Sequence, residues 1–184
     1  MRIYLDTEFI EDEHGIDLIS IGLVREDGKE LYLINRECDW KRVLADDWLS
    51  RNVVPHLPAM GDPCWEYASS IRTKVWEFCC HPIRYTHESR GGVGIYKVPH
   101  PTTPDFWADW AAYDWVVLCR LYGRMVNLPQ GFPMYCNDFQ QLIAGTGFVP
   151  EEPKTTHDAL EDARCLRDNH LKFLSGTSAT MLGT

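Results

Sequence analysis

Three short runs of β-branched, aliphatic and aromatic residues dominate the start of the chain, at 2–6, 17–25 and 30–35. Residues 26–29 separate the second run from the third, and Gly28 permits the positive φ that a tight turn needs. Strands joined by so short a turn pair antiparallel. We therefore predict that the fold begins with an antiparallel three-stranded meander.

The later segments have the periodicity of helices and of one buried strand: helices are predicted at 65–80, 112–123, 138–144 and 158–174, and a strand at 106–110. Thr155 and Thr156 precede the last helix and are its predicted N-caps. An antiparallel start followed by βα units is typical of a mixed α/β domain. We predict a ribonuclease-H-like sheet, with its first three strands antiparallel, flanked by helices.

A chain of 184 residues fits one domain, because roughly 150 residues already bury about two-thirds of their unfolded surface. We predict that this domain spans residues 1–174. Glycines and prolines concentrate between residues 81 and 104, which predicts an inserted loop or hairpin there. The small and polar residues 175–184 predict a flexible tail.

Composition excludes several classes of protein. The formal net charge is −9, so bulk neutralisation of phosphates by lysine and arginine does not explain any binding of nucleic acid. The seven cysteines are an odd number without a Cys-x-x-Cys pair, which argues against a disulfide framework and against a zinc ribbon. The chain has neither the apolar segment of a signal peptide nor a run of about 18 apolar residues. We expect a cytoplasmic protein with reduced thiols and no membrane partner.

Asp6 and Glu8 stand two positions apart, with Thr7 between them, where the first apolar strand is predicted to end. Because side chains alternate along a strand, both carboxylates lie on one face. An acid-x-acid pair alone is a weak signal, since about four would arise by chance among 27 acidic residues. Here an apolar strand leads into the pair, and ionised groups in such surroundings need a metal ion or another partner.

Asp114 is the candidate third acid. It begins the helix predicted at 112–123 and follows the strand at 106–110, and α/β sheets keep functional groups at such strand ends. An acid that only stabilises the helix N-terminus is the other interpretation. Asp109, inside the predicted strand, is a rival ligand.

His157 and Asp162 form the last candidate pair. On a helix Asp162 lies beside Ala159 and Leu166 at the edge of the apolar face, whereas Glu161 points toward solvent. His157 lies about 140° around the helix from Asp162, so both reach one site only if His157 stands at or before the first turn. The alternative for Asp162 is an acid on an ordinary amphipathic helix that has no role in a site. The alternative for His157 is a hydrogen-bonded histidine of the surface or the core.

Three motifs thus follow one another along the chain: Asp6-x-Glu8, Tyr113-Asp114 and His157-x-x-x-x-Asp162. In this order they resemble the exonuclease motifs of the DEDD superfamily, and the histidine is typical of its His-containing branch. More closely, residues 1–35 and 106–170 resemble the small mycobacterial polyadenylate-specific 3′-exoribonucleases. The asparagine that often stands three residues before Tyr113 in the superfamily is absent here.

The resemblance implies a metal-dependent 3′→5′ exoribonuclease that releases nucleoside 5′-monophosphates from RNA 3′ ends. It implies two divalent ions, Mg²⁺ or Mn²⁺, about 3.5–4 Å apart. Asp6, Glu8 and Asp162 would hold one ion, and Asp6 and Asp114 the other. His157 would accept a proton from the attacking water.

The resemblance also implies single-stranded RNA or an RNA 3′ overhang as substrate, and a homodimer. Thr7 and Phe9 are predicted to contact the substrate, and for Phe9 stacking on terminal bases and a place in the core are equally plausible. Trp107, Trp110 and Trp115 are predicted to belong to the core, and a stacking platform for bases is the alternative interpretation. Six basic residues are candidates for contacting the RNA backbone: Lys74, Arg84, Arg90, Lys97, Arg120 and Arg124.

Two other functions remain open at this stage. One is a DNA 3′→5′ exonuclease of the trimming or proofreading type, with the same acidic site. The other is a catalytically silent ribonuclease-H-like module that only binds nucleic acid.

Overall fold

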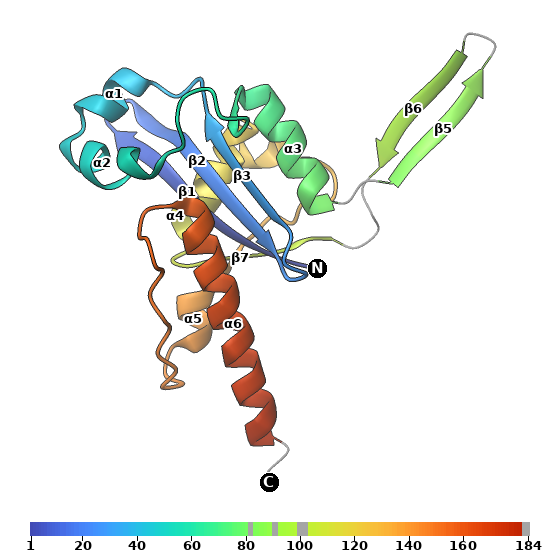
Figure 1. Ribbon diagram of the computed structural model, residues 1–184. Helices are drawn as coiled ribbons and strands as arrows, with labels where there is room; N and C mark the ends of the chain where they lie inside the picture. The colour runs from blue at the N-terminus through green and yellow to red at the C-terminus, as the bar shows by residue number, and fades with distance from the viewer. Residues whose placement is uncertain (81–82, 90–91, 99–102, 182–184) are drawn as a thin grey trace.

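A computed structural model of the protein describes residues 1–80, 83–89, 92–98 and 103–181. At its centre is a six-stranded sheet (Figure 1) with the strand order β4-β3-β2-β1-β7-β8. The strands are β1 (Arg2–Asp12), β2 (Gly15–Arg25), β3 (Glu30–Asn35), β4 (Trp65–Glu66), β7 (Asp105–Ala108) and β8 (Asn137–Asp138). β1, β2 and β3 pair antiparallel, whereas β4, β7 and β8 join the sheet parallel to their neighbours.

The predicted antiparallel meander is confirmed, but its first strand is longer than predicted. β1 runs on to Asp12 because its ladder with β2 continues to the pair of Asp12 and Gly15, with a register shift between Glu8 and Phe9. The prediction that Asp6 and Glu8 stand where the strand ends is therefore wrong. Both residues lie inside β1, at the level where the neighbouring β7 has already ended.

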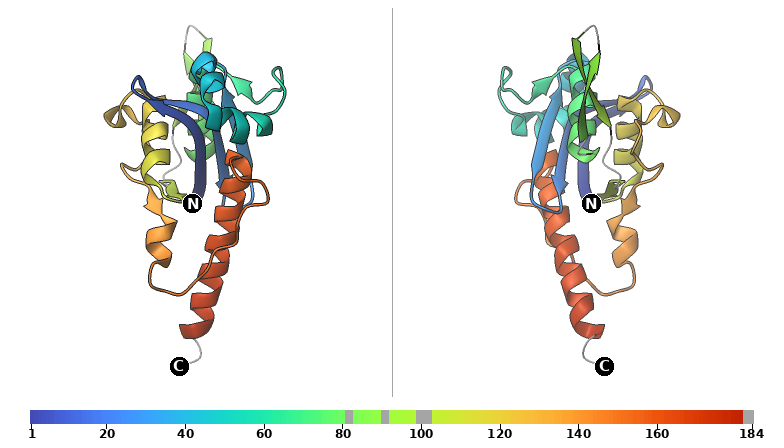
Figure 2. Two further views of the ribbon diagram at one scale, coloured as in Figure 1. Left: turned by 90° about the vertical axis from the view of Figure 1, so that its left-hand side faces the viewer. Right: turned by 90° about the vertical axis from the view of Figure 1, so that its right-hand side faces the viewer.

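Helices cover both faces of the sheet, and Figure 2 shows α4 and α6 on opposite sides of its central strands. The α-helices are α1 (Trp40–Ala45), α2 (Asp47–Asn52), α3 (Ala68–Cys80), α4 (Ala112–Leu121), α5 (Phe139–Ile143) and α6 (Ala159–Met181). Short 3₁₀ turns span Val54–His56 and Met125–Asn127. A mixed sheet between helices confirms the predicted α/β class and is consistent with a ribonuclease-H-like fold.

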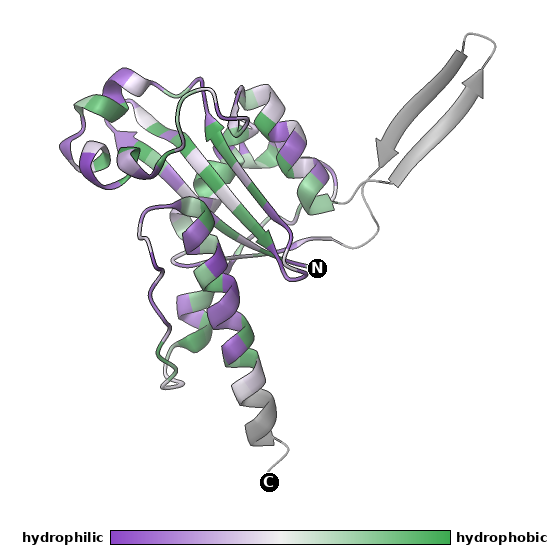
Figure 3. Cartoon of the chain, in the orientation of Figure 1, coloured by the Kyte–Doolittle hydropathy of each residue, from purple (hydrophilic) through white to green (hydrophobic). Residues whose placement is uncertain are grey.

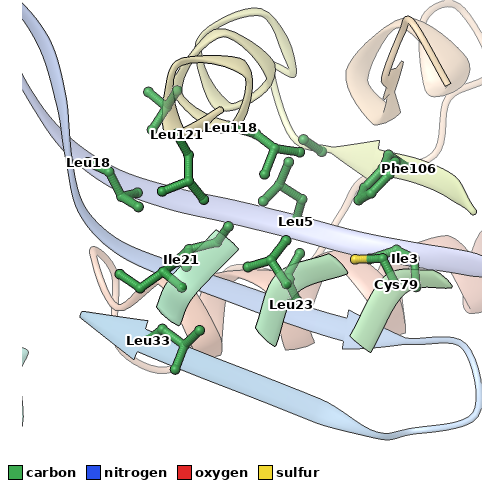
Figure 4. Close-up of a cluster of buried hydrophobic side chains, with 14 of the residues drawn as sticks. Ile3, Leu5, Leu18, Ile21, Leu23, Leu33, Cys79, Phe106, Leu118 and Leu121 are labelled. Carbon is green, nitrogen blue, oxygen red and sulfur yellow. The ribbon is translucent and has the colours of Figure 1, made fainter. Parts of the chain in front are cut away.

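The alternation of side chains along β1 assigns each face its helices. Ile3 and Leu5 belong to the largest buried cluster, with α3 and α4 (Figure 4). Tyr4 packs with α5 and α6, and Ile10 packs with α1 and α2. Because both faces are buried, the strands are apolar along much of their length, as the colouring in Figure 3 shows. The even-numbered positions of β1 thus lie on the face that α6 covers at Tyr4 and that α1 and α2 cover at Ile10.

Gly22 on β2 allows α6 to approach the sheet closely. It stands opposite Asp6 in the ladder of β1 and β2. A Cβ atom at this position would lie 2.1 Å from the carbonyl oxygen of Ala159, the first residue of α6. Any residue other than glycine would therefore push the start of α6 away from the strand that carries Asp6.

The segment predicted as an inserted loop or hairpin, 81–104, contains β5 (Ile83–Ser89) and β6 (Gly92–Val98). These strands pair antiparallel as a second sheet, which projects from the end of α3 (Figure 1). Residues 81–82, 90–91 and 99–102 lie outside the described residues.

The last helix continues beyond its predicted end at Leu174. α6 runs to Met181, and residues 182–184 lie outside the described part of the chain. The domain boundary at 174 and the flexible tail at 175–184 stay predictions. Within the described ranges, no helix combines the length and the apolar character that crossing a membrane requires.

Candidate metal centre

Three carboxylates meet between β1 and the start of α6. Asp6, Glu8 and Asp162 each offer an oxygen, and these oxygens lie within 4.8 Å of one another. Asp6 and Glu8 lie on the same face of β1, and Asp162 lies in the first turn of α6. The close approach at Gly22 holds that turn against the strand. The structure thus brings together residues that are about 150 positions apart in the sequence.

Asp114 reaches the same place from α4. Its Oδ1 accepts hydrogen bonds from the backbone N–H of Thr7 at 2.8 Å and from Thr7 Oγ1 at 2.7 Å. The Thr7 N–H is available because β7 pairs with β1 only as far as Leu5. The rival acid, Asp109, instead accepts a hydrogen bond from Gln140 Nε2 at 2.9 Å. The geometry therefore favours Asp114 over Asp109 as the acid nearest to Asp6.

His157 precedes α6 in a left-handed backbone conformation with φ of +64°. The N-cap of α6 is Asp158, whose side chain accepts hydrogen bonds from the backbone N–H groups of Leu160 and Glu161. The prediction that Thr155 and Thr156 cap this helix is therefore wrong, because α6 begins at Ala159 and Asp158, directly before it, takes that place. His157 lies before the first turn, and its ring contacts the Trp48 ring edge-on at a centroid distance of 4.7 Å.

Burial and mutual repulsion destabilise the ionised form of these acids. Burial, followed by the charges of Asp114 and Asp162, raises the pKa of Asp6 well above its usual range. The pKa of Glu8 rises to about 8, again mainly through burial. Burial raises the pKa values of Asp114 and Asp162 to about 6, against hydrogen bonds from Thr7 and from the His157 backbone that lower them.

The acids have no ion pair with lysine or arginine among the described residues. A cluster of buried and half-buried carboxylates without a cationic side chain is a fit for divalent cations, which would supply the missing positive charge. All the donors are oxygen atoms, which suits Mg²⁺ and Mn²⁺ better than softer metals.

The acids lie in a cavity of about 730 Å³, which Trp48, Trp110 and His157 also line. Phe9 is half-buried against the main cluster, and its ring is parallel to the ring of Tyr113 at 5.6 Å. Trp107 and Trp115 pack on the core as predicted. Trp110 does not: the prediction of a core residue is wrong, because 71% of this side chain is exposed.

Of the candidate cations for RNA contact, Lys74, Arg120 and Arg124 do not line the cavity. Lys74 is paired with Glu66, and Arg120 and Arg124 are exposed. The side chains of Arg84, Arg90 and Lys97 lie outside the described part of the structure.

Sequence reasoning missed Trp48 and Trp110. Trp48 comes from α2, far along the chain from every motif, and no local pattern connects it with His157. Trp110 is the last residue of the strand predicted at 106–110, but β7 ends at Ala108, and the positive φ of 55° at Trp110 cannot be read from the sequence.

Comparison with known proteins yields consistent matches. The family model described as "3'-5' exoribonuclease Rv2179c-like domain" matches residues 1–170. Two proteins of Mycobacterium tuberculosis are similar to the chain: 3'-5' exoribonuclease MT2234.1 of strain CDC 1551 / Oshkosh and 3'-5' exoribonuclease Rv2179c of strain ATCC 25618 / H37Rv. Each is 37% identical over 166 residues, which cover 89% of this chain and 88% of the relative.

Proposed function

Because the chain belongs to the family of Rv2179c-like 3′-5′ exoribonuclease domains, we propose that it is a metal-dependent 3′→5′ exoribonuclease that releases nucleoside 5′-monophosphates from RNA. The observation that carries the proposal is the cluster of Asp6, Glu8 and Asp162, whose oxygens lie within 4.8 Å of one another. Phosphodiester hydrolysis needs positive charge at the phosphate, and this cluster is where the chain can bind it.

Asp6, Glu8 and Asp162 would hold one divalent ion, and Asp6 with Asp114 a second, as Mg²⁺ or Mn²⁺. When bound, such ions lower the pKa of a coordinated water and stabilise the attacking and leaving oxygens. Thr7 holds Asp114 through two hydrogen bonds to a single oxygen, Oδ1. This leaves the other oxygen, Oδ2, available to bind the second ion together with Asp6.

His157 is the proposed proton acceptor. It stands in the same cavity as the acids, and its backbone hydrogen bond toward Asp162 ties its position to that ligand. The edge of Trp48 limits the movement of the imidazole ring. An acceptor held in this way can take a proton from water that attacks the terminal phosphodiester. These assignments correspond to the His-containing branch of the DEDD superfamily.

RNA is the proposed substrate because both relatives are named as exoribonucleases. A single-stranded 3′ end or an RNA 3′ overhang is the proposed form, since an exonuclease must reach the terminal nucleotide unpaired. The resemblance to dimeric enzymes further predicts a homodimer. Sedimentation equilibrium tests this prediction, because it measures the molar mass in solution.

The decisive experiment compares three substrates with purified protein: single-stranded RNA labelled at its 5′ end, the same RNA blocked at its 3′ end, and DNA of the same sequence. We expect progressive shortening of the unblocked RNA with Mg²⁺ or Mn²⁺, protection by the 3′ block, and no reaction in EDTA. Cleavage that persists in EDTA would contradict the mechanism. Preferential shortening of DNA would support the DNA exonuclease instead, and binding without any cleavage would support the silent module.

A further inference from the structure

Trp110 combines two unfavourable features at the mouth of the cavity. Its side chain is 71% exposed, and its backbone is left-handed with φ of 55°. A left-handed conformation is unfavourable for a residue with a Cβ, and exposing an indole forgoes the stabilisation that its burial would give. The fold therefore gains little from tryptophan at this position, where glycine or asparagine would be less strained.

The neighbouring residues impose this conformation from both sides. Asp109 Oδ1 accepts a hydrogen bond from Gln140 Nε2 at 2.9 Å, and the N–H of Ala111 donates to Asp138 Oδ2, also at 2.9 Å. Asp138 in turn caps α5 through the N–H of Gln141. Trp110 is thus fixed between two anchors on the start of α5. Strained backbone that its surroundings hold so firmly is typical of functional positions.

The indole of Trp110 is free to stack, unlike other rings in the cavity. Phe9 and Tyr113 stack on each other, and Trp48 contacts His157. Trp110 has no ring partner among the residues that the structure describes.

The charge of the cavity indicates which part of a nucleotide would meet this ring. Nine acidic side chains line the cavity and, within the described chain, no lysine or arginine does. Outside the reach of the metal ions this lining repels phosphate, so an uncharged contact must hold the nucleotide there. An aromatic face binds any nucleobase by stacking, which is worth about 1–3 kcal/mol per base.

We propose that Trp110 is a stacking platform for a nucleobase at the 3′ end of the RNA, and that it makes the enzyme depend on bases as well as on the phosphodiester. The inference rests on the proposed exoribonuclease function. It assigns to Trp110 a role in substrate binding, whereas the carboxylates and His157 act on the phosphate and the water.

The test compares RNA with an intact 3′ end and RNA with an abasic site at the terminal or the penultimate position. Wild-type protein should lose about 5- to 150-fold in kcat/KM at one of the two abasic positions. Trp110→Ala should lose a similar factor on intact RNA, mainly through KM, and should no longer distinguish that abasic RNA from intact RNA. Trp110→Phe should recover most of the loss, because it keeps a stacking face.

Two further variants separate binding from folding. Trp110→Gly removes the ring and the strained conformation together, so we expect it to melt no lower than wild type while it loses the same discrimination. Tyr67→Ala removes an exposed aromatic residue that does not line the cavity and should leave KM unchanged. Full discrimination in an active Trp110→Ala or Trp110→Gly protein would overturn the inference. A wild-type protein that shortens no RNA would instead overturn the proposed function.

Discussion

Asp162 and His157 lie five positions apart, and the proposed mechanism gives them different tasks that substitution can separate. Asp162→Asn removes a ligand charge, so we expect metal affinity to fall and turnover to disappear. His157→Ala keeps the three clustered carboxylates and removes only the proton acceptor. We expect it to lose about 10²–10⁴-fold in rate while metal affinity changes little. Calorimetric titration with Mn²⁺ and single-turnover hydrolysis measure the two quantities.

The pH dependence of His157→Ala provides the control for this prediction. Hydroxide can replace a missing base, so the rate of this variant should recover in part as the pH is raised. If His157→Ala keeps full activity with the pH profile of wild type, His157 is not the acceptor.

Asp109→Asn is the control for Asp162→Asn, because it also removes one acidic charge. Asp109 bonds to Gln140 rather than to Thr7, so this variant should retain metal binding.

At the scale of elements, the geometry of the candidate metal centre depends on how closely α6 approaches the sheet. Gly22→Ala would place a methyl group 2.1 Å from the carbonyl oxygen of Ala159, so the first turn of α6 must move. We expect a loss of about 3 kcal/mol in the free energy of unfolding, which corresponds to roughly 10 °C in Tm. Metal affinity should fall as well, because Asp162 moves with that turn. Thermal denaturation with and without Mg²⁺ measures both effects.

Gly176→Ala is the control within the same helix. Apart from the neighbouring residues and the backbone of α6 itself, no heavy atom lies within 4 Å of a Cβ atom at Gly176, so the methyl group meets open space. Alanine is the better helix former, by up to about 1 kcal/mol, and Tm should stay constant or rise. Equal Tm values and equal metal affinities for Gly22→Ala and wild type would contradict the role given to Gly22.

Most elements could be predicted from the sequence because their patterns are local. The run 30–35 coincides with β3, and the helix predicted from residue 112 begins at Ala112. The family match over residues 1–170 also confirms the resemblance to the small 3′-exoribonucleases that the sequence motifs indicated.

The errors concern features that depend on distant residues. β1 extends to Asp12 because β2 pairs with it, and the position of Trp110 depends on Gln140 and Asp138. The meeting of Asp6 with Asp162 could be expected only from the resemblance, since the close packing at Gly22 leaves no trace in local periodicity. The roles of the individual site residues stay predictions.

At the scale of the whole molecule, a buried histidine should make stability depend on pH. His170 is enclosed by the rings of Tyr4, Trp107 and Phe139, and its Nδ1 has no hydrogen-bond partner among the described residues. Burial, and secondarily the charge of Arg2, lowers its pKa from 6.5 to about 4. As the pH falls from 6.5 to 4, the histidine is protonated in the unfolded chain before it is protonated in the folded protein. The free energy of unfolding therefore decreases over this pH range, by about 3 kcal/mol from this group.

His170→Phe should remove this contribution, so its unfolding free energy should fall less steeply with acid than that of wild type. The raised pKa values of Asp114 and Asp162 act in the opposite direction, but they are common to both proteins and cancel in the comparison. His14→Gln is the control, because the side chain of His14 is 67% exposed. Urea denaturation at pH 4.5 and 7 measures the difference. Parallel pH dependence in wild type and His170→Phe would disprove the assignment.

The proposed ligands are also spread along almost the whole chain, from Asp6 in the first strand to Asp162 in the last helix. Translation adds about 150 residues after Asp6 before it reaches Asp162, and the candidate metal centre is complete only when α6 has packed beside Gly22. A nascent chain of a ribonuclease built in this way carries an incomplete site until Asp162 has been made. We therefore expect the nascent chain to cleave RNA only after α6 has been made and has packed against β1.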